Sequence, residues 1–342
     1  MMNCTKKLIT IISGYLNEIK VWLKGELRPI INWERYYRVR KSYNSDKEVF
    51  GEKEVVFMVD GLLNHGGLSD RFNGIISTYA ICKCKQYPFR ISWTYPFRLD
   101  DYLNPNEYDW SIDESSPEVV KNQTTRALVV LNDPNGRGLL NLKLRRQTHV
   151  YANMNLLSLI NKKYHTEYKW HELFQELFKP VEGIEQQLKI HTERISTDYI
   201  GVVFRFQQLL GDFKEGNYPT LNQKEREKLI KKCLDAVKNI RDRHNNYAIL
   251  VTSDSKTFLK NVELLDKCYI IPGEIVHIMF TRDASFNTYM KSFIDFFMLS
   301  KAKKVYSVVT SEMTIDGHLF FTTFPEFAAK SNNVPFERII IE

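Results

Sequence analysis

The chain lacks several features that would assign it to a common class. Its 342 residues contain no run of about 18 apolar side chains, the length that a membrane-crossing helix needs. They show no zinc-finger spacing, no basic recognition helix, no aromatic RNA-binding signature and no internal repeat. The net charge of +7 is modest and spread along the chain. We therefore expect neither a transmembrane helix nor a nucleic-acid partner, whereas the charge fits an anionic substrate or a membrane surface.

Cysteine is scarce, and its spacing suggests no disulfide framework. The chain has five cysteines, an odd number, and the closest pair, Cys82-Lys-Cys84, does not have CxxC spacing. Near the N-terminus, Lys6 and Lys7 precede only the six residues LITIIS, which are too few for a signal-peptide core, and no cleavage site follows. These features predict reduced, structural cysteines in a cytoplasmic protein.

The first 45 residues differ in pattern from the rest. Apolar side chains recur at helical spacing from Leu8 to Leu23, and Trp33 to Lys41 adds aromatic and basic residues. We predict an N-terminal helical extension over residues 1–48. One interpretation is an amphipathic helix in peripheral contact with the inner face of the membrane. The other is a helix that packs on the main body, which we favour because acids dilute the positive face: Glu18, Glu26 and Glu34.

The most informative segment runs from Asn64 to Lys83 and contains the pair Gly66-Gly67. It follows the apolar run Val55 to Val59, so the order predicts a strand, a glycine turn and a helix. Glycine lets the backbone approach a ligand closely, and the first N–H groups of the helix then face whatever lies over the turn. In open α/β sheets this crevice binds ligands. A tight turn without a ligand is an equally good interpretation.

Beyond residue 48, strand-like runs alternate with helical stretches, as is typical of parallel sheets covered by helices. The length fits two domains. We predict an N-terminal α/β domain over residues 49–195 and a C-terminal Rossmann-like domain over residues 196–342. The predicted strands are Val55 to Val59, Phe89 to Trp93, Ala127 to Leu131, Tyr199 to Phe206, Tyr247 to Thr252, Cys268 to Ile271 and Lys304 to Val309. The predicted helices include Leu156 to Phe178, Gln223 to Asn245, Lys256 to Leu265 and Tyr289 to Ala302.

Polar residues follow three predicted strands of the second half. They are Arg205, then Ser253-Asp254, then Thr310-Ser311. The carboxyl ends of parallel strands meet at one edge of a sheet, so these groups would converge there. An arginine and hydroxyls can bind phosphate, and an acid can bind a base or a ribose. Together these groups would suit a nucleotide. The alternatives are that Arg205 is an ordinary salt-bridge partner and that the hydroxyls cap helices.

The sequence resembles bacterial glycosyltransferases of the fucosyltransferase type, the group that includes the α1,6-, α1,2- and protein O-fucosyltransferases. The glycine turn, Gly66 to Arg71, is similar to a G-G-x-G-N/Q motif, from which Ser69-Asp70 departs. Val203-Phe204-Arg205 resembles a His-x-Arg motif that has lost its histidine. Asp295 to Ala302, followed by Val305 to Ser311, resembles a D-x-x-x-L-S-x-A segment that ends in serine. Thr252-Ser253-Asp254 is similar to the "T-D" strand end.

The resemblance implies a GT-B fold, with two Rossmann-like domains whose parallel sheets face a cleft. The domain over residues 49–195 would then lie on the acceptor side. It implies an inverting transfer of fucose from GDP-fucose to a glycan hydroxyl, with no cofactor and no divalent metal. The sequence contains no Asp-x-Asp, the motif that metal-dependent glycosyltransferases commonly use. A surface glycan of capsule or lipopolysaccharide type, or its lipid-linked intermediate, is the expected acceptor.

The resemblance also assigns roles to single residues. Arg205 would neutralise the charge that develops on the β-phosphate, because its planar fork can bind two oxygens. Asp295 would bind guanine. The catalytic base would be Asp212, which Glu215 follows closely in the chain, with His65 as the second candidate. An ordinary solvated loop carboxylate is an equally good interpretation of Asp212, and His277 is more readily a core histidine than a ligand contact. The remaining predicted nucleotide-sugar ligands are Gly66, Gly67, Arg71, Ser253, Asp254, Thr310 and Ser311.

Two alternatives remain open at this stage. The same fold can carry a transferase for another nucleotide sugar, since fold does not determine substrate. The loss of the motif histidine at Val203 fits a homologue that binds nucleotide or glycan without catalysis.

Overall fold

The computed structural model describes residues 30–43, 52–112, 119–195, 198–213, 219–278, 281, 285–315 and 318–342. The predicted helix from Leu8 to Leu23 and the acid Glu215 lie outside these ranges. The described chain divides into two compact units. The first contains the described residues up to His65, with Asn73–Ser92 and Ile112–Thr166, and the second contains Gly66–Phe72, Trp93–Ser111 and Glu167–Glu342.

The first unit is built on a four-stranded sheet in the order β2-β1-β5-β4. Its strands are β1 (Val55–Val59), β2 (Phe89–Trp93), β4 (Arg126–Val130) and β5 (Thr148–Ala152). β5 pairs in parallel with both β1 and β4. The helices are α2 (Leu68–Lys85), which belongs to this unit from Asn73 onward, α3 (Arg137–Leu140) and α4 (Leu157–Tyr164).

Residues 30–42 are also helical and pack on this sheet. Val39 and Tyr43 are fully buried against β1, β4 and β5. The hydroxyl of Tyr43 lies 2.6 Å from Nδ1 of His149, and Arg40 donates to the carbonyl of Thr125 at 2.6 Å. This part of the predicted extension therefore packs on the first unit, whereas the choice between the two interpretations of the helix from Leu8 to Leu23 stays a prediction.

The second unit is built on a five-stranded sheet in the order β13-β10-β7-β8-β9, with all four pairs parallel. Its strands are β7 (Tyr199–Phe204), β8 (Ala248–Ser253), β9 (Cys268–Tyr269), β10 (Lys304–Thr310) and β13 (Phe336–Ile341). From β7 the chain builds outward through β8 and β9, and then returns to place β10 on the other side of β7. The strand order therefore reverses between β7 and β10, where ligands bind in sheets of this kind.

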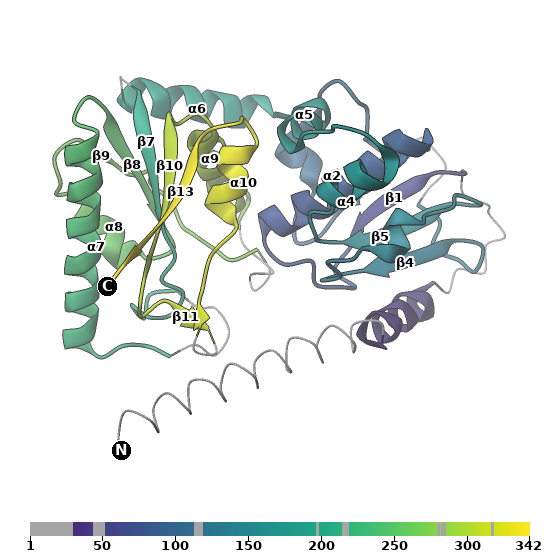
Figure 1. The fold of residues 1–342 in the computed structure, drawn as a ribbon, viewed down its shortest axis with the longest axis horizontal. Coiled ribbons are helices and arrows are strands. Elements are labelled where there is room, and N and C mark those ends of the chain that lie inside the picture. Colours follow the sequence, from purple (N-terminus) through teal and green to yellow (C-terminus); the bar gives the residue numbers. More distant parts are fainter. Residues whose placement is uncertain are drawn as a thin grey trace, which may run out of the picture. The chain divides into compact units, whose positions relative to one another are not determined.

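Helices cover both faces of this sheet (Figure 1). α7 (Gln223–Arg243) and α8 (Lys256–Val262) pack against Ile200, Val202 and Phe204 of β7. α9 (Phe286–Ser300) and α10 (Phe324–Lys330) lie on the other face. A Cβ added to Gly201 would come within 2.7 Å of Leu299 Cδ2, so glycine allows the close approach of α9 to β7.

Shorter elements complete the second unit. They are the 3₁₀ turn Leu99–Asp101, α5 (Trp170–Leu177), α6 (Glu182–Ile195), the antiparallel pair β3 (Leu103–Pro105) and β6 (Phe178–Pro180), and the hairpin β11 (Thr314–Ile315) and β12 (His318–Leu319). This unit is discontinuous in sequence. It includes residues 66–72, 93–111 and 167–195, which we predicted to lie in the N-terminal domain. The composition of the sequence does not reveal where a chain crosses between units.

Candidate functional site

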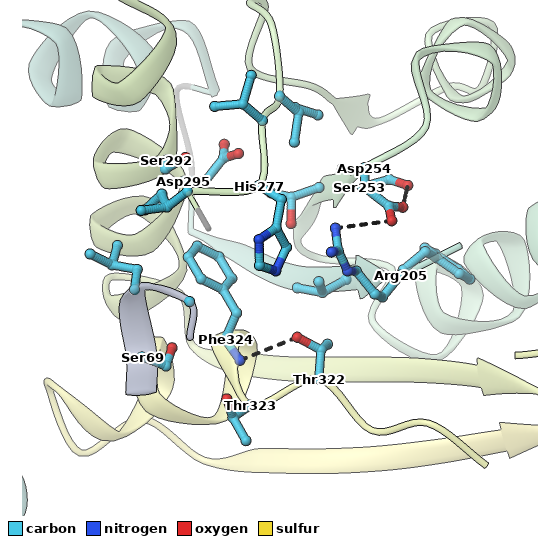
Figure 2. Close-up of a pocket in the computed structure, with 18 of the residues that line it drawn as sticks. Ser69, Arg205, Ser253, Asp254, His277, Ser292, Asp295, Thr322, Thr323 and Phe324 are labelled. Atoms are coloured by element: carbon cyan, nitrogen blue, oxygen red, sulfur yellow. Dashed lines mark hydrogen bonds and ion pairs between the residues drawn. The ribbon is translucent and has the colours of Figure 1, made fainter. Parts of the chain in front are cut away.

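A cavity of about 300 Å³ opens at the carboxyl ends of β7 and β8. Every residue that lines it belongs to the second unit. Figure 2 shows side chains from several separate segments around this space. The lining residues are 67–70, 203–205, 252–254, 275–278, 292, 295 and 320–324.

Arg205 is held in the cavity wall by a network centred on Asp254. The Asp254 carboxylate accepts the backbone N–H groups of Phe206 at 2.8 Å and Gln207 at 2.7 Å, and Nη1 of Arg205 lies 3.0 Å from it. The guanidinium also lies 4.8 Å from the ring centre of Phe213. Burial raises the pKa of Asp254, and Arg205 opposes that rise. The Arg205 side chain keeps 17% exposure, so a positive group in a fixed position faces the cavity.

Asp295 supplies a carboxylate to another part of the wall. Its Oδ2 pairs with Lys291, one helical turn earlier on α9. Its Oδ1 is buried and has no hydrogen-bond partner among the described residues. Burial raises the pKa of this carboxyl, and Lys291 opposes the rise. A buried acceptor without a donor is costly, which indicates that a ligand can complete the site.

His277 is the only imidazole among the described lining residues, and it comes from the segment after β9. Burial, followed by the charges of Arg205 and Arg71, lowers the pKa of His277 to about 3. The ring is therefore neutral at physiological pH. Val203, which stands where the His-x-Arg motif has its histidine, also lines the cavity. The cavity therefore contains an imidazole, but from His277 and not from position 203.

The glycine turn is closed by its own helix. Gly66 has φ of +85°, and a Cβ there would come within 2.3 Å of Asp70 Oδ2. The same oxygen accepts the N–H of Gly67 at 3.0 Å. Asp70 thus satisfies an N–H group at the start of α2 and places a negative charge where the sequence analysis expected open donors. Burial raises the pKa of this carboxyl, and both Gly67 and Asp70 line the cavity.

Arg71 supports the turn and does not line the cavity. Its guanidinium donates to the carbonyl of Gly66 at 3.3 Å and of Tyr95 at 3.0 Å, and it lies 4.9 Å from the ring centre of Trp93. Burial lowers the pKa of Arg71 to about 10. Arg71 therefore stabilises the glycine turn and does not contact the cavity.

The hydroxyls in the cavity are not those of Thr310 and Ser311. Thr310 is fully buried, and Ser311 is exposed beside Lys232. The hairpin β11–β12 separates β10 from α10, so Thr322 and Thr323 line the cavity in their place. The sequence does contain a signal for this position, since Thr323-Phe-Pro-Glu326 has the spacing of a helix start with an early proline.

Two predicted bases lie outside the cavity lining. The Asp212 carboxylate accepts the hydroxyl of Ser255 at 2.8 Å and the N–H of Thr257 at 2.7 Å, so it caps the start of α8. His65 is 1% exposed and packs in the first unit between Phe57 and Tyr151. The predicted residues that line the cavity are Gly67, Arg205, Ser253, Asp254, His277 and Asp295. The remaining described ones do not: His65, Gly66, Arg71, Asp212, Thr310 and Ser311.

Among the described residues, no group of three or more histidine, cysteine, aspartate or glutamate side chains is arranged to hold a metal ion. In the same part of the chain, no helix combines the length and apolar character needed to cross a membrane.

Solved structures with a similar fold include fucosyltransferases. A mutant of Arabidopsis thaliana FUT1 in complex with GDP matches with a TM-score of 0.52 at 14% identity, over 90% of this chain and 74% of that chain. The fucosyltransferase NodZ from Bradyrhizobium matches with a TM-score of 0.48 at 13% identity, over 81% and 91%. POFUT1 in complex with GDP matches with a TM-score of 0.43 at 9% identity, over 85% and 99%.

No protein-family model and no curated protein sequence matches the chain. We therefore rely on the first structural match, and for the fold alone. The predicted α/β fold class is confirmed: the chain shares its fold with Arabidopsis thaliana FUT1, and both units are built on sheets that contain parallel strand pairs.

Proposed function

We propose that this protein is a glycosyltransferase that takes fucose from GDP-fucose and holds the donor in the cavity of the second unit. One observation supports this most strongly. Arg205, fixed by Asp254, and the unsatisfied Oδ1 of Asp295 line the same cavity, at the carboxyl ends of the strands beside the switch point. The cation can bind the diphosphate of a purine nucleotide, and the buried acceptor can bind its base, so the two groups fit the two ends of one ligand.

The guanine end is assigned to Asp295. Guanine presents N–H donors at N1 and at its 2-amino group, which a carboxylate can accept, whereas the same edge of adenine has no such pair of donors. Phe320, Phe321 and Phe324 line the cavity and offer rings on which a base can stack. A donor is therefore expected to be bound through guanine in preference to other bases.

The diphosphate end is assigned to Arg205. Negative charge develops on the β-phosphate as the bond to the sugar breaks, and a preorganised guanidinium stabilises it without reorganising. The hydroxyls of Thr322 and Thr323 and the neutral ring of His277 supply further polar groups in the same cavity. With these groups in place the transfer proceeds without a divalent metal, in an inverting displacement.

The acceptor hydroxyl needs a base, and the cavity favours Asp70 for this role over Asp212 and His65. Three described aspartates line the cavity. Asp254 is occupied by two N–H groups and Arg205, and Asp295 is paired with Lys291. Asp70 accepts one N–H, and burial raises the pKa of its carboxyl, which makes it a stronger base than an ordinary aspartate.

The acceptor and the cellular location belong to the same proposal. The acceptor is a hydroxyl of a surface glycan of capsule or lipopolysaccharide type, free or lipid-linked. The protein acts in the cytoplasm, with peripheral contact to the inner membrane through its N-terminal segment. The amphipathic spacing from Leu8 to Leu23 supports this contact.

Thermal stabilisation by a panel of nucleotides tests the donor. GDP should raise the melting temperature, and UDP, CMP and ADP should not, because a ligand that binds only the folded state stabilises it. Arg205→Ala should abolish the GDP response and lower turnover about a hundredfold. Arg38→Ala, which removes an exposed arginine of the first unit, serves as the control. A full GDP response in Arg205→Ala would end the assignment of this site.

The same measurements separate the alternatives. Stabilisation by UDP alone would indicate a transferase for another nucleotide sugar. Stabilisation by GDP without turnover of GDP-fucose on any glycan acceptor would indicate a binding homologue without catalysis.

A further inference from the structure

A second polar surface lies on the first unit, apart from the donor cavity. A hollow of about 580 Å³ is lined by four cations and one amide: Arg126, Lys143, Arg145, Arg146 and Asn141. We call this set the basic hollow. From residue 134 to residue 166 the sequence contains six lysines and arginines and neither aspartate nor glutamate.

The local fold exposes these cations to solvent, because buried leucines alternate with them along the loop. Along residues 141–146, Leu142 and Leu144 are buried, whereas Lys143, Arg145 and Arg146 are exposed. The loop carbonyls are satisfied by basic side chains. Lys85 donates to Leu142 at 2.7 Å, and Arg126 donates to Lys143 at 3.0 Å. The positive charge is therefore fixed by the packing of the loop.

No carboxylate neutralises this surface within the described part of the first unit. The ion pairs found there use other cations: Arg38, Arg90 and Lys121. Like charges held together without counter-charges repel each other, so the arrangement is unfavourable unless an anion binds.

The position argues against a role in the donor chemistry. Arg126 is the first residue of β4 and pairs with Thr148, the first residue of β5. Arg146 lies two residues before β5. The basic hollow therefore lies at the amino edge of the sheet, whereas reacting ligands of α/β sheets bind at the carboxyl edge.

The residues that line the basic hollow fit the phosphate groups of a phospholipid surface better than they fit a nucleic acid. The lining contains no aromatic ring on which a base can stack. Its cations lie on a loop and a strand end, and the preceding helix α3, with only four residues, is too short to serve as a recognition helix.

The neighbouring helix carries residues typical of a membrane interface. Ile30, Trp33 and Tyr37 fall on one face of the helix over residues 30–42 and are 63%, 67% and 61% exposed. Trp33 stacks on Tyr37 at 6.2 Å. Tryptophan and tyrosine are enriched where a bilayer meets water. This helix runs along β4. Asn32 near its start donates to the carbonyl of Leu131, past the carboxyl end of β4, and Arg40 near its end donates to that of Thr125, beside the basic hollow. Trp33 therefore lies toward the other end of the strand from the basic hollow.

We propose that the basic hollow docks the first unit on the surface of a bilayer rich in anionic phospholipid. This contact uses residues separate from the N-terminal segment and does not depend on the donor assigned above. Such a surface would bring the enzyme to an acceptor carried on lipid.

Sedimentation of the full chain with vesicles tests this proposal. Vesicles of phosphatidylcholine with about one third phosphatidylglycerol should bind the protein, and pure phosphatidylcholine should not. A triple variant, Lys143→Gln, Arg145→Gln and Arg146→Gln, should bind about a hundredfold more weakly, because each surface cation contributes about a factor of five. Raising the salt concentration should weaken binding of the unaltered protein.

The matched control removes three exposed lysines from α7: Lys224→Gln, Lys228→Gln and Lys231→Gln. It should bind nearly as well as the unaltered protein. Equal losses in both variants, no loss in the first, or no binding by the unaltered protein would each overturn the proposal. So would a first variant that loses affinity for an oligonucleotide but not for vesicles. Stabilisation by GDP, measured on the same proteins, reports folding and the donor site independently.

Discussion

Asp254 and Arg205 lie next to each other at the ends of adjacent parallel strands, and the carboxylate that pairs with the guanidinium also fixes the turn that follows it. Asp254 Oδ2 lies 3.0 Å from Arg205 Nη1 and 2.7 Å from the N–H of Gln207. Gln207 has φ of +56°, an uncommon conformation for a residue with a side chain. One buried carboxylate therefore sets both the direction of Arg205 and the shape of its loop.

Asp254→Ala should therefore affect stability and binding together. Loss of a buried partner leaves two backbone N–H groups and a cation unsatisfied, which costs about 3 kcal/mol of unfolding free energy. Asp254→Asn keeps one acceptor oxygen and should cost about half as much. Urea unfolding measures both, and the GDP response of the folded protein should be weak in each. A normal GDP response in Asp254→Ala would show that Arg205 does not need this partner.

Asp295→Asn should weaken GDP selectively. The amide presents a donor where guanine needs an acceptor, so we expect at least a tenfold rise in the Kd for GDP, about the value of one lost hydrogen bond to a charged group. Competition by inorganic pyrophosphate, which lacks a base, should not change. Titration calorimetry of both ligands provides the measurement, and an equal loss for both would remove Asp295 from the base site.

Much of the fold could be predicted because its strands are apolar runs. Val55–Val59 and Phe89–Trp93 were predicted with their observed limits, and β7 was predicted from Tyr199 with its end two residues too late. β5 was missed although it is fully buried, because it contains Thr148, His149 and Tyr151. His149 and Tyr151 bond to partners distant in sequence, Tyr43 and Asp60, which periodicity cannot reveal.

The helices show a similar limit. Leu156 to Phe178 was predicted as one stretch, but His165 has φ of +54° and ends α4 before α5 begins at Trp170. The site was predictable where a residue directly follows a strand, as Arg205 and Asp254 do. It was not predictable where a hairpin displaces the next helix, as happens between Thr310 and Thr322. The position of Asp70 in the cavity wall was not predicted either, because its contact with the glycine turn depends on the fold of that turn.

The contribution of the cavity hydroxyls can be tested by comparing Thr322 and Thr323, which line the cavity, with Ser311, which does not. Thr322→Val and Thr323→Val together should weaken GDP binding by about tenfold, if each hydroxyl contributes one ordinary hydrogen bond. Ser311→Ala, outside the cavity lining, should have no effect. Both can be measured by the shift in melting temperature across a GDP titration. Weaker binding in Ser311→Ala alone would restore the position predicted from the sequence.

The base can be identified with a pair of aspartate variants. Asp70→Asn should lower kcat by about a hundredfold or more, since general bases contribute on that scale, with little change in GDP binding. Asp212→Asn should lower the melting temperature, because it weakens the cap of α8, and leave the kcat of folded enzyme nearly unchanged.

The pH profile adds a check on Asp70. Because burial raises the pKa of this carboxyl, the rate should fall on the acid side at a higher pH than for an ordinary aspartate. That acid limb should disappear in Asp70→Asn. A loss of kcat in Asp212→Asn with normal activity in Asp70→Asn would return the role to Asp212.

Two histidines, the buried His149 and the partly buried His277, should make the protein sensitive to acid. Burial lowers the pKa of both His149 and His277 to about 3, below the usual value of about 6.5. Between these values the unfolded chain binds more protons than the folded chain, so stability falls as the pH drops. From pH 7 to pH 5 each should cost about 2 kcal/mol of unfolding free energy. Urea unfolding at the two pH values measures this, and His277→Gln should remove about half of the difference. An unchanged slope in that variant would mean that His277 is solvated and charged in the cavity.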